Sequence, residues 1–209
     1  MRERRNSAHG RESRELILET ALAVIGRRGY GATSLRDIAA EVGMTQAGML
    51  HHFGTKENLL VEVLRQRDAA SRAALAEEQG DRPDGEPMAV RVARRNAHAP
   101  ALVHLYVSLQ AAAFSPEHPA HAFFRERQRE IHDIVAGDIR SAQDAGGVAA
   151  DVDADGLATV ILALSDGLQA QQGVDPSIDI AGTLDWLWRR VAEPPAPPTP
   201  GPAVSPRPA

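Results

Sequence analysis

The spacing of apolar residues constrains the fold of this chain more than any other feature. Apolar side chains recur three and four positions apart along most of the 209 residues, and no alternating run of β-branched or aromatic residues lies between turn residues. Such spacing places the apolar side chains on one face of a helix. We therefore predict an all-α fold.

Caps and breaks divide this pattern into separate helices. Gly29 and Gly43 follow helical runs, where glycine favours a left-handed C-cap. Ser34, with Asp37 three residues later, predicts an N-cap of the capping-box type. The predicted helices cover about residues 11–28, 34–42, 46–52, 55–78, 88–98, 101–114, 120–145, 154–172 and 178–191, with bounds uncertain by about 2–4 residues.

The chain is predicted to have two helical domains between two terminal extensions. We expect residues 1–10 to form a flexible basic arm, residues 11–70 the first domain and residues 71–192 the second. Residues 80–87 combine glycine, proline and aspartate and form the clearest internal loop. In the segment 193–209, eight of 17 residues are proline, so we expect a disordered tail.

Composition restricts the classes of function. The chain has no cysteine, which excludes disulfides, thiol nucleophiles and cysteine-ligated metals. No apolar segment is long enough to span a bilayer, and no signal-peptide core follows the basic N-terminus, so we expect a cytoplasmic protein without a membrane partner. The net charge is −5, but residues 1–60 hold nine basic against seven acidic side chains. Only this part suits the phosphates of a nucleic acid.

Residues 34–56 carry the most informative pattern. Two short helices are joined by a three-residue turn that begins at Gly43, and another helix, capped by Thr55, follows them. This arrangement is typical of a helix-turn-helix, at about residues 34–53. In such a unit the second helix enters the major groove of DNA and its N-terminal side chains contact base edges. Double-stranded operator DNA is therefore the expected partner.

The second short helix supplies the candidate base contacts. The Gln46 amide can pair with an adenine edge, and Ala47 is small enough to contact a thymine methyl group. Arg36 can reach guanine or phosphate, and Gly48 suggests a close backbone approach, because glycine weakens a helix by about 1 kcal/mol relative to alanine. The predicted DNA-binding residues are Ser34, Arg36, Thr45, Gln46, Ala47, Gly48, Leu50, His51, His52, Thr55 and Lys56. The predicted core residues of this domain are Tyr30, Ile38, Met49, Phe53 and Leu60.

Residues 29–60 read GYGATSLRDIAAEVGMTQAGMLHHFGTKENLL. This segment closely resembles the DNA-binding domain of the TetR-like (tetracycline-repressor) family, and the resemblance extends over about residues 11–67. It implies an N-terminal three-helix helix-turn-helix domain and a C-terminal helical domain for effector binding and dimerisation. It also implies phosphate contacts at Ser34 and Lys56. Leu50 stands where the family commonly has a tyrosine that touches the DNA backbone, and a neighbouring histidine is the expected replacement.

The same resemblance implies that the C-terminal domain binds a small effector and forms a homodimer through its last two long helices. The sequence permits this interface, because small residues along 154–172 allow close helix packing. The predicted interface residues are Leu157, Ile161, Leu164, Gly167, Leu168, Leu184, Leu187 and Trp188; the alternative places them in the intramolecular core. Polar or aromatic residues within apolar helices are the candidate pocket residues: His98, His104, Tyr106, Gln110, Phe114, Phe124 and His132. Because they include no cluster of arginine or lysine, they favour a neutral or weakly polar organic effector.

We thus expect a repressor that a small organic effector releases from its operator, with no cofactor and no catalytic residues. The helix over about 55–78 is the only element expected to carry the signal from one domain to the other. A ligand-independent regulator or activator with the same DNA site is the first alternative. The second is a metal-dependent enzyme built from His98, His104, His132 and Asp166, but no metal-binding or nucleophile motif organises these residues. We predict no metal site.

Overall fold

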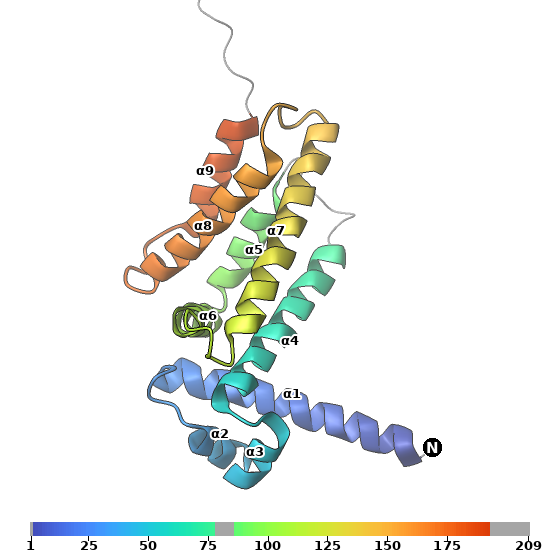
Figure 1. The fold of residues 1–209 in the computed structure, drawn as a ribbon, viewed down its shortest axis with the longest axis vertical. Helices are drawn as coiled ribbons and strands as arrows, with labels where there is room; N and C mark the ends of the chain where they lie inside the picture. The colour runs from blue at the N-terminus through green and yellow to red at the C-terminus, as the bar shows by residue number, and fades with distance from the viewer. Residues whose placement is uncertain (1, 78–85, 193–209) are drawn as a thin grey trace, which may run out of the picture.

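The computed structural model describes residues 2–77 and 86–192, and within these ranges all regular structure is helical. The helices are α1 (Arg2–Arg28), α2 (Leu35–Val42), α3 (Gln46–Phe53), α4 (Lys56–Glu77), α5 (Met88–Ala97), α6 (Pro100–Ala112), α7 (His121–Asp144), α8 (Ala154–Gln172) and α9 (Ile180–Ala192). Figure 1 shows α1, α2 and α3 at one end of the molecule and the bundle of α5, α7, α8 and α9 at the other. The fold is therefore all-α, as predicted.

The helix bounds agree with the predicted bounds to within two residues, with one exception. Helix α1 begins at Arg2 instead of at about Arg11, so the stretch 2–10, expected to be a flexible arm, is helical. Most of the loop predicted at 80–87, and the whole of the predicted tail at 193–209, lie outside the described residues.

The caps that the sequence predicts are present around the two short helices. The Ser34 hydroxyl accepts a hydrogen bond from the Asp37 backbone N–H at 3.2 Å, and the Asp37 carboxylate accepts one from the Ser34 backbone N–H at 2.9 Å. Gly29 and Gly43 have φ angles of 83° and 77°, a left-handed conformation in which a side chain would be strained. These caps fix where α2 begins and where α1 and α2 end.

Two hydrophobic clusters build the core. The first joins α1, α2, α3 and the start of α4 to α6 and the start of α7, and it includes the predicted core residues Ile38, Met49, Phe53 and Leu60, with Tyr30 packed at its edge. The second joins α5, α7, α8 and α9. Because α6 belongs mainly to the first cluster, the boundary between the two clusters lies inside the predicted C-terminal domain.

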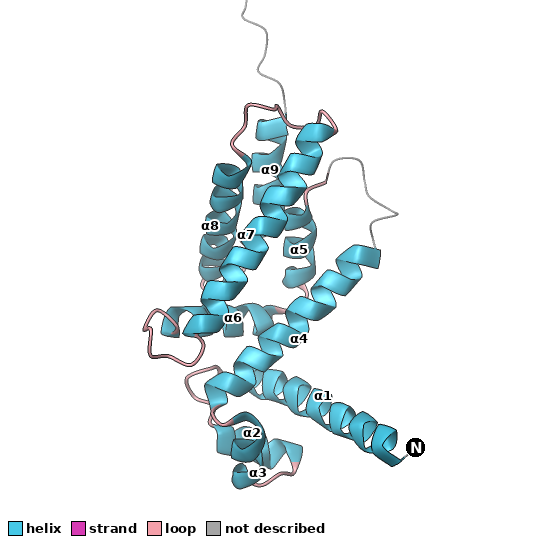
Figure 2. Ribbon diagram, turned by 45° about the vertical axis from the view of Figure 1, so that its right-hand side comes forward, coloured by secondary structure: helices cyan, strands magenta, loops and turns pink. Residues whose placement is uncertain are grey.

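Two helices connect the ends of the molecule. Helix α4 runs from the α2–α3 end along the bundle (Figure 2). Helix α6 packs directly on α1, and a Cβ atom added to Gly26 would lie only 2.7 Å from the Ala101 Cβ. Helix α4 is therefore the element that runs between the two ends, and the small size of Gly26 adds a second contact between them by letting α6 approach α1 closely.

Candidate DNA-binding surface and effector cavity

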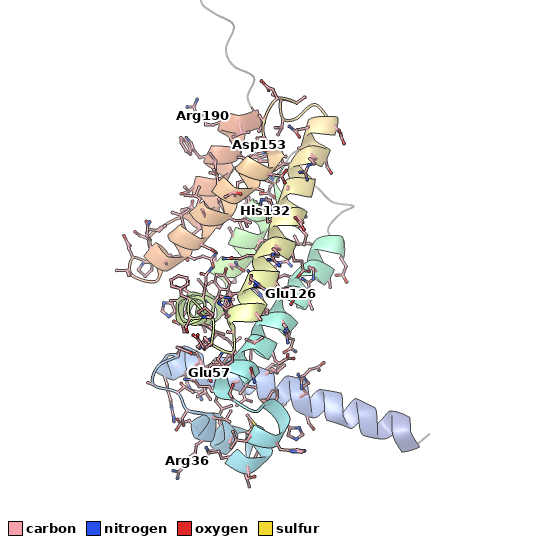
Figure 3. The ribbon with its side chains drawn as sticks, in the orientation of Figure 1. Arg36, Glu57, Glu126, His132, Asp153 and Arg190 are labelled. Atoms are coloured by element: carbon pink, nitrogen blue, oxygen red, sulfur yellow. The ribbon has the colours of Figure 1, made fainter. Side chains whose placement is uncertain are left out.

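Helices α2 and α3 form the free end of the molecule. Helix α3 buries Met49 and Phe53 against the core and leaves its other side toward solvent. Thr45 caps this helix, and its hydroxyl accepts a hydrogen bond from the Gly48 backbone N–H at 3.1 Å. Figure 3 shows Arg36 of α2 at the same end, pointing away from the body of the protein. Helix α3, which the sequence predicts to contact base edges, thus packs on the core through its apolar side and exposes its polar side to solvent.

Most of the predicted DNA-binding residues lie on this open end. The exposed residues are Ser34, Arg36, Thr45, Gln46, Ala47, Leu50, His51 and His52, and the half-buried ones are Gly48, Thr55 and Lys56. Leu50 is 46% exposed, as single apolar residues on a protein surface often are. Thr55 caps α4 by accepting a hydrogen bond from the Asn58 backbone N–H at 3.1 Å.

Ion pairs between α1 and α2 use part of the positive charge that the sequence places here. Arg27 pairs with Glu41 at 2.7 Å, and Arg28 pairs with Asp37 at 3.0 Å. Hydrogen bonds from Ser34, with a smaller contribution from the Arg28 charge, hold the pKa of Asp37 below its ordinary value. Arg36, the arginine of α2, has no ion pair within the described residues. It therefore remains available to a phosphate or a base.

Lys56 has a role that the sequence did not reveal. Its ammonium group donates hydrogen bonds to the backbone carbonyls of Tyr30 and Thr33 at 3.0 and 2.9 Å, and it lies 4.3 Å from the centre of the Tyr30 ring. The lysine therefore fastens the loop between α1 and α2 to the start of α4. An ammonium group has three donors, so one is left for a phosphate contact.

A cavity of about 160 Å³ lies between α4 and the bundle of α5, α7, α8 and α9. Its apolar walls are formed by residues of all the helices from α4 to α9: Leu64, Leu75, Met88, Ala89, Val92, Ala93, Leu102, Val103, Ile131, Ile134, Val135, Leu162 and Ile180. Its polar lining consists of Arg67, Asp68, Ser71, Arg72, Asn96, Tyr106, Arg127, Ser165, Asp166 and Gln169. An apolar chamber with a few polar groups is typical of a small-molecule site.

Of the seven pocket candidates named from the sequence, only Tyr106 lines this cavity. Gln110 and Phe124 contact Tyr106 without lining the cavity. The Gln110 side-chain amide donates a hydrogen bond to the Tyr106 hydroxyl at 3.2 Å, and the Phe124 ring packs on the Tyr106 ring with centroids 5.5 Å apart. The other four candidates lie elsewhere: His98 at the exposed end of α5, His104 against Gly173, Phe114 with 80% of its side chain exposed, and His132 at the Asp155 carbonyl. Three arginines, Arg67, Arg72 and Arg127, line the cavity, whereas the candidate set from the sequence contained none.

A polar network crosses one wall of the cavity and joins four helices. Arg127 of α7 donates two hydrogen bonds to the Asp68 carboxylate of α4, at 2.7 and 3.0 Å, and its guanidinium lies 4.8 Å from the centre of the Tyr106 ring of α6. The Tyr106 hydroxyl donates to Asp166 of α8 at 3.2 Å, and Gln110 donates to the same carboxylate at 3.0 Å.

The titration behaviour of this network follows from its burial. Burial opposes the charge of Arg127, but the hydrogen bonds to Asp68 and the neighbouring negative charges hold its pKa above the ordinary value. Burial, reinforced by Asp166, raises the pKa of the Tyr106 hydroxyl, so it remains a neutral hydrogen-bond donor. The Asp68–Arg127 pair therefore ties α4 to the bundle as a charged, bidentate contact.

The residues predicted for a dimer interface differ in their burial. Ile161, Leu184 and Trp188 are buried in the second cluster, as in the intramolecular alternative, and Leu157, Leu164, Leu168 and Leu187 are half-buried against it. Gly167 is exposed, and it continues a stripe on α8 that includes Ala163 and Val160, with Val160 52% exposed. On α9, Trp186 is 60% exposed.

The residues of the metal-enzyme alternative are not brought together. His132 contacts the Asp155 carbonyl and the Thr159 hydroxyl, whereas Asp166 belongs to the network around Tyr106. Within the described ranges, no three His, Asp or Glu side chains are grouped as metal ligands. Across the same ranges, no helix has the length and apolar character needed to cross a bilayer.

Sequence reasoning missed most of the polar lining of the cavity, including Arg67, Asp68, Asn96 and Arg127. Charged residues within amphipathic helices usually lie on a solvated face, and nothing in the local pattern separates these from exposed arginines such as Arg129. Arg67 and Asp68 sit on α4, which was assigned to signal transmission and not to binding. Their position near the middle of a helix shared by the two domains was the available signal.

Comparison with known proteins agrees with this architecture. The family model described as "Bacterial regulatory proteins, tetR family" matches residues 17–63, and the model "BetI-type transcriptional repressor, C-terminal" matches residues 92–192. The chain is 33% identical over 120 residues to the HTH-type transcriptional regulator BetI of Agrobacterium fabrum, a match that covers 56% of this chain and 52% of that one. It is 43% identical over 49 residues to the HTH-type transcriptional repressor KstR2 of Mycobacterium tuberculosis, covering 23% and 24% of the two chains. The chain thus spans about half, or less, of the length of these curated relatives.

Solved structures resemble the molecule over nearly their whole length. A transcriptional regulator of Saccharomonospora viridis, solved in complex with choline, is 29% identical, with a TM-score of 0.69 and coverage of 88% of this chain and 99% of that one. A TetR-family regulator from Rhodococcus sp. has a TM-score of 0.72 at 20% identity, covering 87% and 100% of the two chains, and it shares the fold.

Proposed function

Because the chain belongs to the tetR family of bacterial regulatory proteins, we propose that it is a transcriptional repressor that binds operator DNA through α2 and α3 in the cytoplasm. The observation that carries this proposal is the exposed side of α3. Gln46 and Ala47 project from a helix that is anchored by Met49 and Phe53 and capped by Thr45, so polar and small side chains face outward for readout in a major groove.

The proposed function also includes a small organic effector, which binds the cavity and lowers the affinity of the protein for DNA. The position of the cavity supports this effector role, because α4 contributes six of the lining residues and leads directly to α3. The cavity also favours the ligand-responsive repressor over the ligand-independent regulator, which would need no such chamber. A ligand that binds one conformation better shifts the equilibrium toward it, and DNA and effector must then weaken each other's binding equally.

The protein is proposed to act as a homodimer through the outer face of α8 and α9. The stripe of Val160, Ala163 and Gly167 and the exposed ring of Trp186 support this assignment, because small and apolar residues let helices of two subunits pack closely. Two recognition helices on a two-fold axis would then meet successive major grooves about 34–36 Å apart.

Footprinting of the purified protein on the DNA upstream of its own gene tests the proposal. We expect a protected site with two-fold symmetry that persists under excess random-sequence DNA. Uniform, weak binding that random DNA removes completely would show that the chain is not a sequence-specific repressor.

A further inference from the structure

The cavity contains one arginine whose donors are largely unused, and this residue points to the class of effector. Arg67 lies on α4 at the cavity wall, half-buried, and donates one hydrogen bond, to the side-chain carbonyl of Asn96. A guanidinium group has five N–H donors in a fixed planar fork. Within the described residues, the remaining donors of Arg67 have no hydrogen-bond acceptor.

The other charged groups of the cavity are already matched. Arg127 forms its bidentate pair with Asp68, and Arg72 pairs with Glu130 at 2.7 Å. Asp166 accepts hydrogen bonds from the Tyr106 hydroxyl and the Gln110 amide. Arg67 therefore differs from the other arginines of the lining, because no carboxylate is bound to it.

The electrostatic surroundings of Arg67 favour an added negative charge. Burial lowers its pKa, Asp68 opposes that effect, and the positive charges of Arg127 and Arg95 lower the pKa further. Because Asp68 is held by Arg127, the carboxylate whose charge acts on Arg67 is already shared with a second cation. A partly buried cation with unused donors is costly unless an anion binds it.

The same cavity is poorly suited to a quaternary ammonium head group. Such cations are bound by open aromatic faces, and Tyr106 is the only aromatic side chain among the described lining residues. Its ring already carries the Arg127 guanidinium, 4.8 Å from the ring centre. The lining therefore offers no open aromatic face to choline, the ligand present in the Saccharomonospora viridis regulator.

We propose that the effector cavity takes a small organic acid, whose carboxylate binds Arg67 in the bidentate manner and whose apolar body fills the aliphatic chamber. This proposal rests on the proposed function only in calling the ligand an effector, since the proposal itself concerns which class of ligand the cavity binds. Cavities of about 150 Å³ accept a ring the size of benzene, so an aryl or short alkyl acid matches the volume of about 160 Å³. Arginine matches the planar, two-oxygen geometry of a carboxylate.

Isothermal titration of the purified full-length protein, without DNA, tests this assignment. Phenylacetate and 2-phenylethanol share the ring and differ in the head group, and choline serves as the cationic probe. We expect phenylacetate to bind at least about tenfold more tightly than 2-phenylethanol, because hydrogen bonds between two charged groups are stronger than those to a neutral hydroxyl. Choline should bind more weakly than either.

Variants locate the contact. Arg67→Met should reduce the affinity for phenylacetate to that for 2-phenylethanol, and Arg67→Lys should retain part of the preference. Arg129→Met removes the same charge from an exposed position of α7 outside the cavity and should leave the preference unchanged.

Absence of phenylacetate binding, equal affinity for acid and alcohol, tighter binding of choline, or a preference that survives in a folded Arg67→Met protein would each overturn the proposal. The comparison of ligands on the wild-type protein stands even where a variant does not fold. Loss of the DNA footprint would refute the proposed function and leave these titrations unaffected.

Discussion

At the scale of single residues, the exposed end of the molecule separates base contacts from structural contacts. Gln46 and Lys56 were both predicted from the sequence to contact DNA, and they differ in their surroundings. Gln46 is exposed at the start of α3, and its side-chain amide has no hydrogen-bond partner within the described residues. Lys56 is half-buried and holds two backbone carbonyls. Their replacement should therefore have different consequences.

Gln46→Ala should weaken binding to the cognate operator by about 1–3 kcal/mol and leave binding to random DNA nearly unchanged, because a lost bidentate base contact affects discrimination. Affinity measured on both DNAs at one salt concentration tests this. Arg36→Ala is the comparison, since an arginine that binds phosphate would lose affinity for both DNAs. Equal losses on both DNAs for Gln46→Ala would remove this residue from the set of base readers.

Lys56→Met should destabilise the DNA-binding domain, by about 1–2 kcal/mol, in addition to any effect on DNA affinity. Two hydrogen bonds from the ammonium group and its contact with the Tyr30 ring are lost, and bonds to charged groups contribute about 1.5–3 kcal/mol before solvent exposure reduces them. Urea unfolding measures the loss. Stability equal to that of the wild type would mean that Lys56 acts on DNA alone.

At the scale of helices, the α1–α6 contact depends on the absence of one side chain. Gly26→Ala gains helix propensity, but its Cβ would meet the Ala101 Cβ at 2.7 Å, and overpacking of this kind costs about 1–3 kcal/mol. Gly137→Ala in α7 gains the same propensity with nothing within 4 Å, and should stabilise the protein by about 1 kcal/mol. Thermal unfolding should therefore rank Gly137→Ala above Gly26→Ala by at least about 1 kcal/mol.

Replacing the clashing partner provides the control for this contact. Ala101→Gly removes the atom that Gly26→Ala would meet, so the double variant should recover the packing term of the single variant, and the two changes should not be additive. Strict additivity of the two changes, or a Gly26→Ala protein as stable as Gly137→Ala, would show that α6 does not press on α1 in solution.

The ion pair between Asp68 of α4 and Arg127 of α7 leads to a separate prediction. The side chains of Asp68 and Arg127 are only 15% and 22% exposed, so Asp68→Asn leaves a buried guanidinium without its counter-charge. We expect a loss of about 3 kcal/mol, as for other buried pairs broken on one side. Arg127→Met added to Asp68→Asn should restore part of this loss, and a double variant as unstable as the sum of the two single changes would indicate that the pair contributes no specific interaction.

The sequence predicted the helices better than it predicted what lies between them. Caps and breaks are local, so Gly43 and Ser34 placed α2 to within one residue. The cavity is formed by six helices that are distant in the sequence, and whether Arg67 faces a neighbour or solvent depends on how those helices pack. Periodicity alone could not separate Tyr106, which lines the cavity, from Phe114, which lies on the surface. The extension of α1 to Arg2 was missed because the polar stretch 2–10 has no apolar face.

At the scale of the whole molecule, the proposed mechanism depends on the distance between two recognition helices. One subunit presents a single α3, which can fill one half-site, and the energy of a second half-site is gained only when two subunits are held together. Operator affinity should therefore fall sharply when the dimer dissociates, although α2 and α3 are unchanged. The exposed stripe on α8 is the place to make this test without damage to the core.

Val160→Glu places a charge at the centre of the proposed interface, on a side chain that is already 52% exposed in the single subunit. A buried, unpaired carboxylate is strongly unfavourable, so the variant should be a folded monomer by light scattering and should lose at least about tenfold in affinity for the full operator. Val174→Glu is the matched control, because Val174 is 88% exposed in the turn after α8 and lies outside the stripe; it should remain a dimer with full affinity. The substitution Leu164→Asp is less informative, since Leu164 packs partly against the bundle core. If the Val160→Glu protein remains dimeric, the interface lies elsewhere; if it is monomeric and still binds the full operator with unchanged affinity, repression does not depend on the spacing of two recognition helices.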